Sequence, residues 1–452
     1  MKTSRFGWAS LALALTVLWG GGPVGAEDGA VVEEILQVLR DRGIVDDAEY
    51  QRLAAKNAKY EAEQNSWMPE IDWSGDFRFR HESWWIDEDE TGFDGDDRFR
   101  IRYRFRLKGV VNVNEYSDVV FRLVSGDEDD RSNNRTLGSG VDFDTDDIRL
   151  NLAYARMRAP SRWLPFPDGR AVLELGKVPI PFIWKTSGMK KGKDFMLWDN
   201  DLALEGGSLL LSSKPTELSR LFATFGYYID DENSEAKDPH FWGIQAGGHQ
   251  EFCDDFVFGA RASWYEFRSI DADFNDRGAR GEDAGGVTPG GGNIPDGLNG
   301  DIDGNPFRIV ETGAYLTYGG FEAWPITVYG TYAQNLDAES SKEMEYLGAG
   351  AEDTAWGVGV EVGDSKKVVK LGGGYWHIQA NSFPSMFIDS DFLDGRTNRQ
   401  GWAFYGGKEI LKNTELKLTL FVIEPIRTAS AFTESLRDSE RIRLQSDIVF
   451  KF

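Results

Sequence analysis

The sequence predicts an all-β protein, a transmembrane antiparallel β-barrel of about sixteen strands that follows a short helical hairpin. Three observations carry this prediction. A run of cations alternates strictly with apolar residues near the start of the strand-rich region. Strand-like segments are joined by connections of alternating length, as in barrels that cross an outer membrane. The chain ends in an amphipathic strand whose last residue is phenylalanine.

The alternating run covers residues 98–108. Side chains on a strand point to opposite faces with a period of two, so one face is apolar and the other cationic. The apolar face comprises Phe99, Ile101, Tyr103, Phe105 and Leu107, and the cationic face comprises Arg98, Arg100, Arg102, Arg104, Arg106 and Lys108. One such cation at the lipid midplane costs roughly 2–4 kcal/mol, so in a barrel the cations face the lumen. A soluble sheet with one wet face is the alternative.

Connection lengths favour the barrel over the soluble sheet. The predicted strands are 71–84, 98–111, 118–125, 146–158, 170–178, 203–213, 219–229, 240–252, 255–268, 306–318, 325–335, 353–363, 367–380, 398–411, 414–424 and 441–452. Long connections such as 126–145 and 179–202 alternate with short ones such as 112–116 and 412–413. A soluble sandwich has no reason to keep this alternation. A barrel of about sixteen strands is wide enough for an aqueous channel.

The two ends of the chain indicate export. Residues 1–26 have the pattern of a secretory signal: Lys2 and Arg5 precede an apolar stretch, and Val24-Gly25-Ala26 resembles a cleavage site. At the other end, residues 441–452 place alternate apolar side chains on one face and finish at Phe452.

Residues 27–70 are predicted to form a periplasmic helical hairpin and linker before the barrel (71–452). Helical spacing of apolar residues begins near Val32, and Gly43 suits the end of the first helix. Asp46 and Glu49 form a capping box for the second helix.

Composition narrows the function classes. The formal net charge is −25, which argues against nucleic acid as a partner. The mean hydropathy is −0.43, and beyond the signal no apolar stretch reaches the length of a membrane helix. A single cysteine, Cys253, excludes an internal disulfide framework.

Candidate chemistry outside the arginine run is weak. The end of the insertion 269–305 carries oxygen donors at alternating positions, which suits Ca²⁺: Asp296, Asn299, Asp301 and Asp303. The distal glutamate of an EF-hand is missing, so a polar loop without a metal is the alternative. The histidines, His81, His240, His249 and His377, lack a serine nucleophile motif, and we expect no enzyme activity.

Several segments resemble a family of bacterial outer-membrane porins related to the general and phosphate-selective porins. They are the run 98–108, Leu175-Gly176-Lys177 with Pro181-Phe182, Trp198-Asp199-Asn200-Asp201-Leu202 with Glu205-Gly206, and Asp389-Ser390-Asp391-Phe392 with Gly395-Arg396-Thr397-Asn398 and Gly401. The helical hairpin and Phe452 also match. The resemblance implies an outer-membrane channel for small hydrophilic solutes. It also implies a homotrimer in contact with lipid and lipopolysaccharide. The alternatives are a barrel sheath and an adhesion or structural barrel without its own open pore.

Two expectations about the pore follow. By analogy with general porins, the connection 179–202 folds inward and places Lys185, Lys190, Lys191 and Lys193 at a constriction; a solvated surface loop is the alternative. The cationic face of 98–108 lines the lumen and offers successive weak sites to anions. Asp76, Glu174 and Glu205 are candidate inward carboxylates that neutralise part of it.

Overall fold

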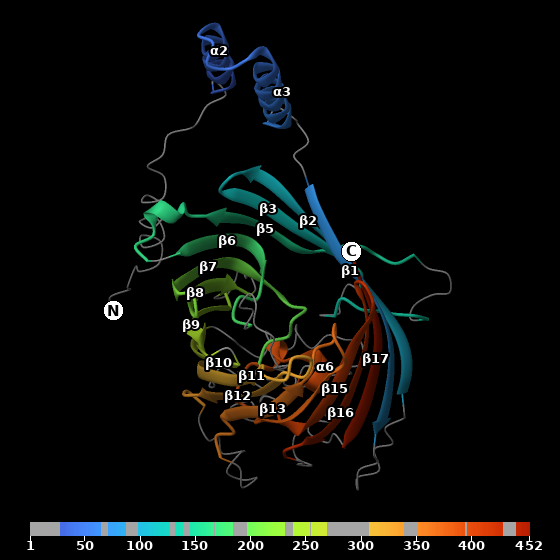
Figure 1. Cartoon of the computed structure of the whole chain (residues 1–452). Helices are drawn as coiled ribbons and strands as arrows, with labels where there is room; N and C mark the ends of the chain where they lie inside the picture. The colour runs from blue at the N-terminus through green and yellow to red at the C-terminus, as the bar shows by residue number, and fades with distance from the viewer. Residues whose placement is uncertain are drawn as a thin grey trace. The chain divides into compact units, whose positions relative to one another are not determined.

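A computed structural model of the chain describes most of the predicted strands and the helical hairpin (Figure 1). The described residues are 28–64, 71–86, 98–126, 132–138, 145–166, 168–183, 197–230, 238–253, 255–268, 307–338, 350–393, 396–427 and 440–452. The predicted export signal at 1–26 lies outside them.

The hairpin consists of α2 (Asp28–Asp41) and α3 (Asp47–Gln64). Gly43 has a φ of +68°, a conformation that closes the end of α2 at no steric cost. The backbone N–H of Glu49 donates to Oδ1 of Asp46 at 2.8 Å, so the predicted cap of α3 is confirmed. In the described part of the chain, no helix combines the length and the apolar character that a membrane crossing requires.

Sixteen long strands and one two-residue strand make up a single sheet. Their bounds are β1 (Ile71–Ile86), β2 (Arg98–Asn114), β3 (Ser117–Val124), β4 (Arg135–Thr136), β5 (Arg149–Arg158), β6 (Arg170–Pro179), β7 (Ala203–Thr216), β8 (Ser219–Ile229), β9 (His240–Cys253), β10 (Phe256–Arg268), β11 (Arg308–Tyr318), β12 (Ile326–Asn335), β13 (Thr354–Val362), β14 (Lys370–Ile378), β15 (Arg399–Leu411), β16 (Thr414–Pro425) and β17 (Arg441–Lys451).

The sheet closes on itself. Neighbouring long strands pair antiparallel along the chain, and β1 pairs with β17 from Asp76 opposite Lys451 to Ile86 opposite Arg441. β1 also pairs with β2, and Figure 1 shows it between β2 and β17. Closure leaves no unpaired edge for lipid to meet. The predicted antiparallel barrel of about sixteen strands is therefore confirmed.

One strand was not expected. β4 lies within the predicted connection 126–145 and pairs with β2, with Arg102 opposite Thr136 and Tyr103 opposite Arg135. β2 has 17 residues and β3 only 8, so β3 cannot cover the whole edge of β2. β4 takes up part of the hydrogen-bonding edge that β3 leaves, because unpaired backbone groups are costly. The next predicted strand, 146–158, accordingly begins three residues later, at Arg149.

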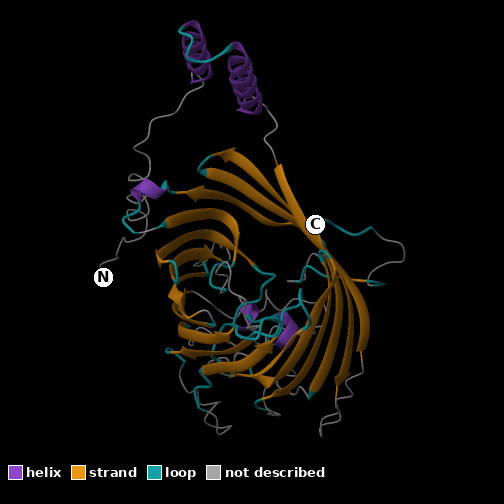
Figure 2. Ribbon diagram, viewed as in Figure 1, coloured by secondary structure: helices purple, strands orange, loops and turns teal. Residues whose placement is uncertain are grey.

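Two connections run inside the ring of strands (Figure 2). The first joins β6 to β7, and the second, from β14 to β15, contains the 3-10 helix η3 (Ser385–Phe387) and α6 (Ser390–Leu393). The backbone N–H of Asp199 in the first donates to the carbonyl of Phe387 in the second at 2.8 Å. Buried rings from both connections and from the strands form one apolar cluster that includes Phe182, Trp198, Phe241, Phe267, Phe383 and Phe387.

Glycines let the chain bend where the first inward connection rejoins the sheet. Gly176 of β6 lies opposite Gly206 of β7, and their φ values are +128° and +156°. A Cβ on Gly206 would lie 2.1 Å from the carbonyl oxygen of Tyr227. Only glycine accommodates this close backbone approach.

Candidate functional site

A charged wall formed by β1, β2 and β17 is the most chemically distinctive surface of the barrel. We use "charged wall" for the polar side chains that alternate with apolar ones on these strands: Asp76, Arg78, Arg80 and Glu82 on β1, the cations of residues 98–108 on β2, and Arg443, Gln445 and Asp447 on β17. Rings on the opposite face, such as Phe77 and Tyr103, stack on one another. The wall therefore faces the interior, where the inward connections contact it.

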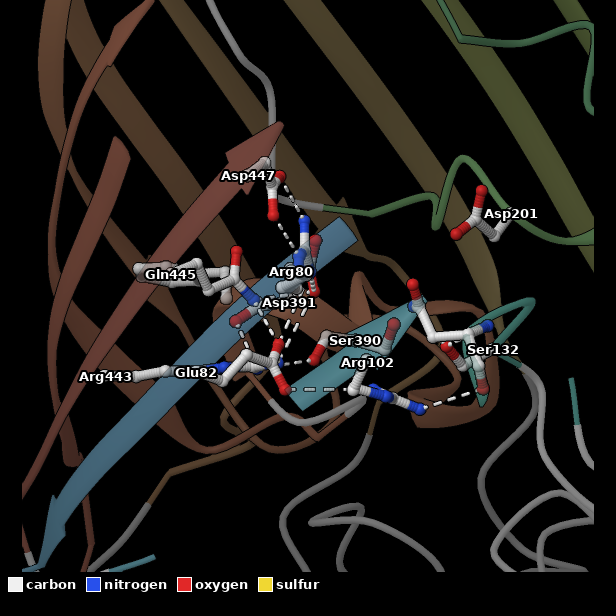
Figure 3. A network of polar contacts seen from close by, with 12 residues as sticks. Arg80, Glu82, Arg102, Ser132, Asp201, Ser390, Asp391, Arg443, Gln445 and Asp447 are labelled. Carbon is white, nitrogen blue, oxygen red and sulfur yellow. Dashed lines mark hydrogen bonds and ion pairs between the residues drawn. The ribbon is translucent and has the colours of Figure 1, made fainter. Parts of the chain in front are cut away.

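Glu82 is the centre of the wall (Figure 3). Its side chain is fully buried and accepts hydrogen bonds from Nη2 of Arg443 at 2.7 Å and from Nε of Arg100 at 2.5 Å. Arg80 and Arg102 lie 3.4 and 3.9 Å from the same carboxylate. Four guanidinium groups thus share one carboxylate, and charge-assisted contacts of this kind are strong in a buried site.

Two further carboxylates hold the other end of the arginine run. Oδ1 of Asp76 accepts from Arg104 at 2.9 Å, and its Oδ2 accepts from Arg106 at 2.7 Å. Asp201, on the first inward connection, lies 3.4 Å from Arg104 and 3.2 Å from Arg106. The same two arginines therefore bind the sheet and the inward connection together.

The second inward connection binds the wall through α6. Asp391 accepts from Nη1 of Arg80 at 2.8 Å, and its backbone carbonyl accepts from Arg443 at 2.8 Å. Arg80 also forms a two-point contact with Asp447, at 2.6 and 2.9 Å. Both inward connections are thus tied to the charged wall as well as to the apolar cluster.

The predicted pore-lining cations occupy different environments along β2. Arg98 is exposed at the end nearer the long connections, and Arg100 lies over the ring of Trp84 at 4.3 Å. Arg102 is buried and donates to the backbone oxygen of Asn134 at 3.3 Å. Lys108 is partly buried near the short β2–β3 hairpin. Their part in conduction stays a prediction.

The predicted inward carboxylates also differ. Asp76 contacts the arginine run, as described above. Glu174 lies opposite Arg156 across the β5–β6 pairing. Glu205 instead accepts a hydrogen bond from Lys177 at 2.9 Å, and both side chains are exposed. Glu205 is therefore not a partner of the arginine run, because it lies opposite Lys177 in the β6–β7 register.

The candidate constriction lysines, Lys185, Lys190, Lys191 and Lys193, and the candidate calcium ligands, Asp296, Asn299, Asp301 and Asp303, lie outside the described residues. In the described part of the first inward connection, the group that contacts the arginine run is the carboxylate of Asp201. Nδ1 of His240 lies 2.9 Å from the backbone oxygen of Asp238.

Sequence reasoning missed most of the wall outside β2. Asp76, Arg78, Arg80 and Glu82 alternate with period two, as the run on β2 does. That alternation was a usable signal for a second charged strand. No comparable local signal marks Asp391, since its role depends on the path of the connection that carries it.

A cavity of about 360 Å³ lies along the part of the wall nearer the short hairpins. Its lining contains two carboxylates, Asp76 and Asp447, and seven cations: Arg78, Arg104, Arg106, Lys108, Arg122, Lys417 and Lys451. A water molecule needs roughly 10–15 Å³ of such space, so the cavity admits hydrated ions. The excess of cations makes it a region of positive potential.

The two inward connections bring buried carboxyl groups together. Asp199 accepts hydrogen bonds from the backbone N–H groups of Asp201 at 2.8 Å and Ser390 at 3.1 Å. Burial, assisted by the negative charge of Asp201, raises the pKa of Asp199 to about 6. Burial and the charge of Asp199 also raise the pKa of Asp389.

The neighbouring Asp391 behaves in the opposite way. Burial opposes its ionisation, but the guanidinium groups of Arg80 and Arg443 outweigh that effect and hold its pKa well below the usual range. The contact between the two connections therefore combines carboxyl groups that favour the neutral form with one that stays charged.

This contact should weaken as the pH rises. The pKa of Asp199 lies above its ordinary value of 3.8, so the docked state binds the proton more tightly. Protonation of Asp199 therefore stabilises the docked state of the two connections by on the order of 1–3 kcal/mol. This stabilisation is complete below about pH 4 and is lost as the pH rises through about 6. We expect a larger single-channel conductance at pH 8 than at pH 5. Asp199→Asn should reduce this difference, whereas the exposed turn variant Glu217→Gln should keep it; equal pH profiles for all three proteins would contradict the assignment.

Comparisons with known proteins give one family match and several similar solved structures. A family model described as "Putative porin" matches residues 93–286 and 304–435. A high-pH structure of Pseudomonas putida OprB is similar, with 10% identity, a TM-score of 0.50, and coverage of 84% of this chain and 94% of that chain. A triple mutant of the Rhodopseudomonas blastica porin aligns with 10% identity over 85% of this chain and 100% of that chain, with a TM-score of 0.40. The search of curated proteins returned no match.

The family match covers well over half of the chain and includes the arginine run, both inward connections and strands from β2 to β16. It confirms the resemblance noted in the sequence. Together with the closed antiparallel barrel, it shows that the chain belongs to this porin family.

Proposed function

We propose that the protein is an outer-membrane porin that lets small hydrophilic solutes diffuse passively and favours anions. The observation that carries the anion preference is the cationic cavity beside the charged wall. Ion selectivity follows the charges that line the narrow part of a pore rather than the net charge of the chain. The acidic composition of the whole protein is therefore compatible with an anion pathway.

The pairing within the wall limits which cations contribute to this preference. Arg100, Arg104 and Arg106 bind carboxylates closely. Their charges are largely compensated, and Arg104 and Arg106 serve mainly to hold the first inward connection through Asp201. The selectivity rests on cations nearer the short hairpins, above all Lys108 and Arg122, which line the cavity.

The proposed function includes the cellular setting. In this proposal the signal at 1–26 directs export, and the barrel inserts with its short hairpins toward the periplasm. The helical hairpin lies in the periplasm, and the protein assembles as a homotrimer. Lipid and lipopolysaccharide would surround the barrel. Neither catalysis nor a resident cofactor is part of the proposal.

A salt gradient tests the anion preference. Purified protein in a planar bilayer, under a KCl gradient, should show a reversal potential whose sign indicates a preference for chloride over potassium. Lys108→Glu should shift it clearly toward potassium, because the variant replaces a cation in the cavity by a carboxylate. Lys177→Gln alters an exposed lysine that pairs with Glu205 and should leave the potential unchanged. A wild-type barrel that folds but does not conduct would refute the channel, and an unchanged potential for Lys108→Glu would refute the assigned pathway.

A further inference from the structure

Lys108 and Arg122 face each other across the β2–β3 hairpin. The backbone N–H of Ser125 donates to the carbonyl of Phe105 at 3.0 Å, which sets the register of the two strands. Three residues closer to the turn on each strand, this register brings Lys108 opposite Arg122. Side chains opposite each other on neighbouring strands lie about 4.5–5.5 Å apart at Cβ, and like charges in this position are destabilising.

No carboxylate of the described residues lies within ion-pair distance of Lys108 or Arg122. Nε and Nη2 of Arg122 both donate to Oδ1 of Asn151, a neutral acceptor. The charges acting on Lys108 come from Arg156, Arg122 and the carboxylate of Glu174. These two cations thus contrast with Arg104 and Arg106, which share Asp76 and Asp201.

Other cations extend the same surface around the cavity. Arg78 donates to the side-chain oxygen of Asn134, again a neutral acceptor. Lys417 and Lys451 lie 3.4 and 3.3 Å from one carboxylate, that of Glu415, and so share a single compensating charge. Five cations from five strands thus surround the cavity with little carboxylate compensation.

We propose that this cavity is a binding site for a small polyvalent oxyanion, of the phosphate or dicarboxylate class, between Lys108 and Arg122. The proposal deepens the proposed function and rests on a lumen that solutes can enter. The N–H groups of Arg122 that do not bind Asn151 remain for an oxyanion, and guanidinium groups bind such anions through paired hydrogen bonds. The ammonium of Lys108 supplies a compact second charge. A polyvalent anion between them removes the like-charge repulsion and compensates both cations at once.

Equilibrium binding of radiolabelled inorganic phosphate to the folded protein in detergent tests the site without any need for conduction. At constant ionic strength, the wild type should bind phosphate. An excess of succinate should displace the bound phosphate, whereas chloride added at the same total anionic charge should displace much less of it. The double variant Lys108→Gln/Arg122→Gln should bind phosphate at least about tenfold more weakly. It should fold, because neither substitution leaves a carboxylate without its partner. Lys108→Arg retains the charge and should retain binding.

The matched control is Arg158→Gln. Arg158 shares Asp118 with Arg156, so its loss leaves that carboxylate paired and removes one cation that does not line the cavity. The site is supported if this control binds phosphate as tightly as the wild type does while the double variant loses phosphate binding. Absence of phosphate binding, or equal binding by the wild type and the double variant, would overturn it. If the wild type conducts chloride in planar bilayers but does not bind phosphate, the proposed channel stands and the binding site is refuted. If it binds phosphate but does not conduct, the binding site stands and the channel is refuted.

Discussion

Glu82→Ala should lower the temperature at which the folded barrel unfolds by more than any other single substitution in the charged wall. Glu82 is fully buried and is shared by Arg80, Arg100, Arg102 and Arg443. Its removal leaves four guanidinium groups close together without that compensating charge. Removing one partner of a buried ion pair costs about 3–5 kcal/mol. Because Glu82 lies on β1 and Arg443 on β17, the substitution removes an ion pair between the two strands that close the barrel.

The measurement is the temperature at which the folded band is lost on gels of unboiled samples. Glu205→Ala is the matched control, since Glu205 is exposed and pairs only with Lys177 among the described residues. Exposed ion pairs contribute about 0–1 kcal/mol, so this variant should unfold close to the wild-type temperature. Equal unfolding temperatures for Glu82→Ala and Glu205→Ala would contradict the central role of Glu82.

Trp198→Ala should enlarge the pore. Trp198 is 5% exposed, and its ring centroid lies 5.7 Å from that of Phe182, 5.0 Å from that of Phe383 and 5.4 Å from that of Phe387. The contacts with Phe383 and Phe387 join the first inward connection to the second. Truncating a buried tryptophan costs about 3–5 kcal/mol. The loss should release the first connection from the second, while the hydrogen-bonded strands remain paired.

Single-channel conductance in planar bilayers measures this effect, and we expect a rise of about twofold or more, because the two inward connections narrow the lumen. Trp163→Ala is the control, since Trp163 is 44% exposed in the 3-10 helix η1 (Ser161–Trp163) between β5 and β6. It should conduct like the wild type. A folded Trp198→Ala barrel with unchanged conductance would show that the inward connections do not limit the pore.

Local pattern alone determined the sixteen long strands and their faces, but not the short β4. The period of two in residues 98–108 separates Phe99 and Tyr103 from the arginines whatever the strand pairs with, because side-chain direction is a property of the extended backbone. The alternation of long and short connections predicted antiparallel neighbours and a closed barrel, which β1 and β17 form. The cap of α3 at Asp46 is likewise local, since its hydrogen bond joins residues three apart.

Only the tertiary structure decided which charges meet. Glu82 and Arg443 are 361 residues apart, and Arg80 and Asp391 are 311 apart, so their contacts exist only after the barrel has closed and α6 has entered it. Nothing around Trp198 or Phe383 in the sequence distinguishes a connection that folds inward from one that stays outside. That choice follows from packing and from buried charge pairing, which depend on residues brought together from many strands. For the same reason, the sequence predicted a charged strand, but it did not show which cations are compensated and which face the cavity.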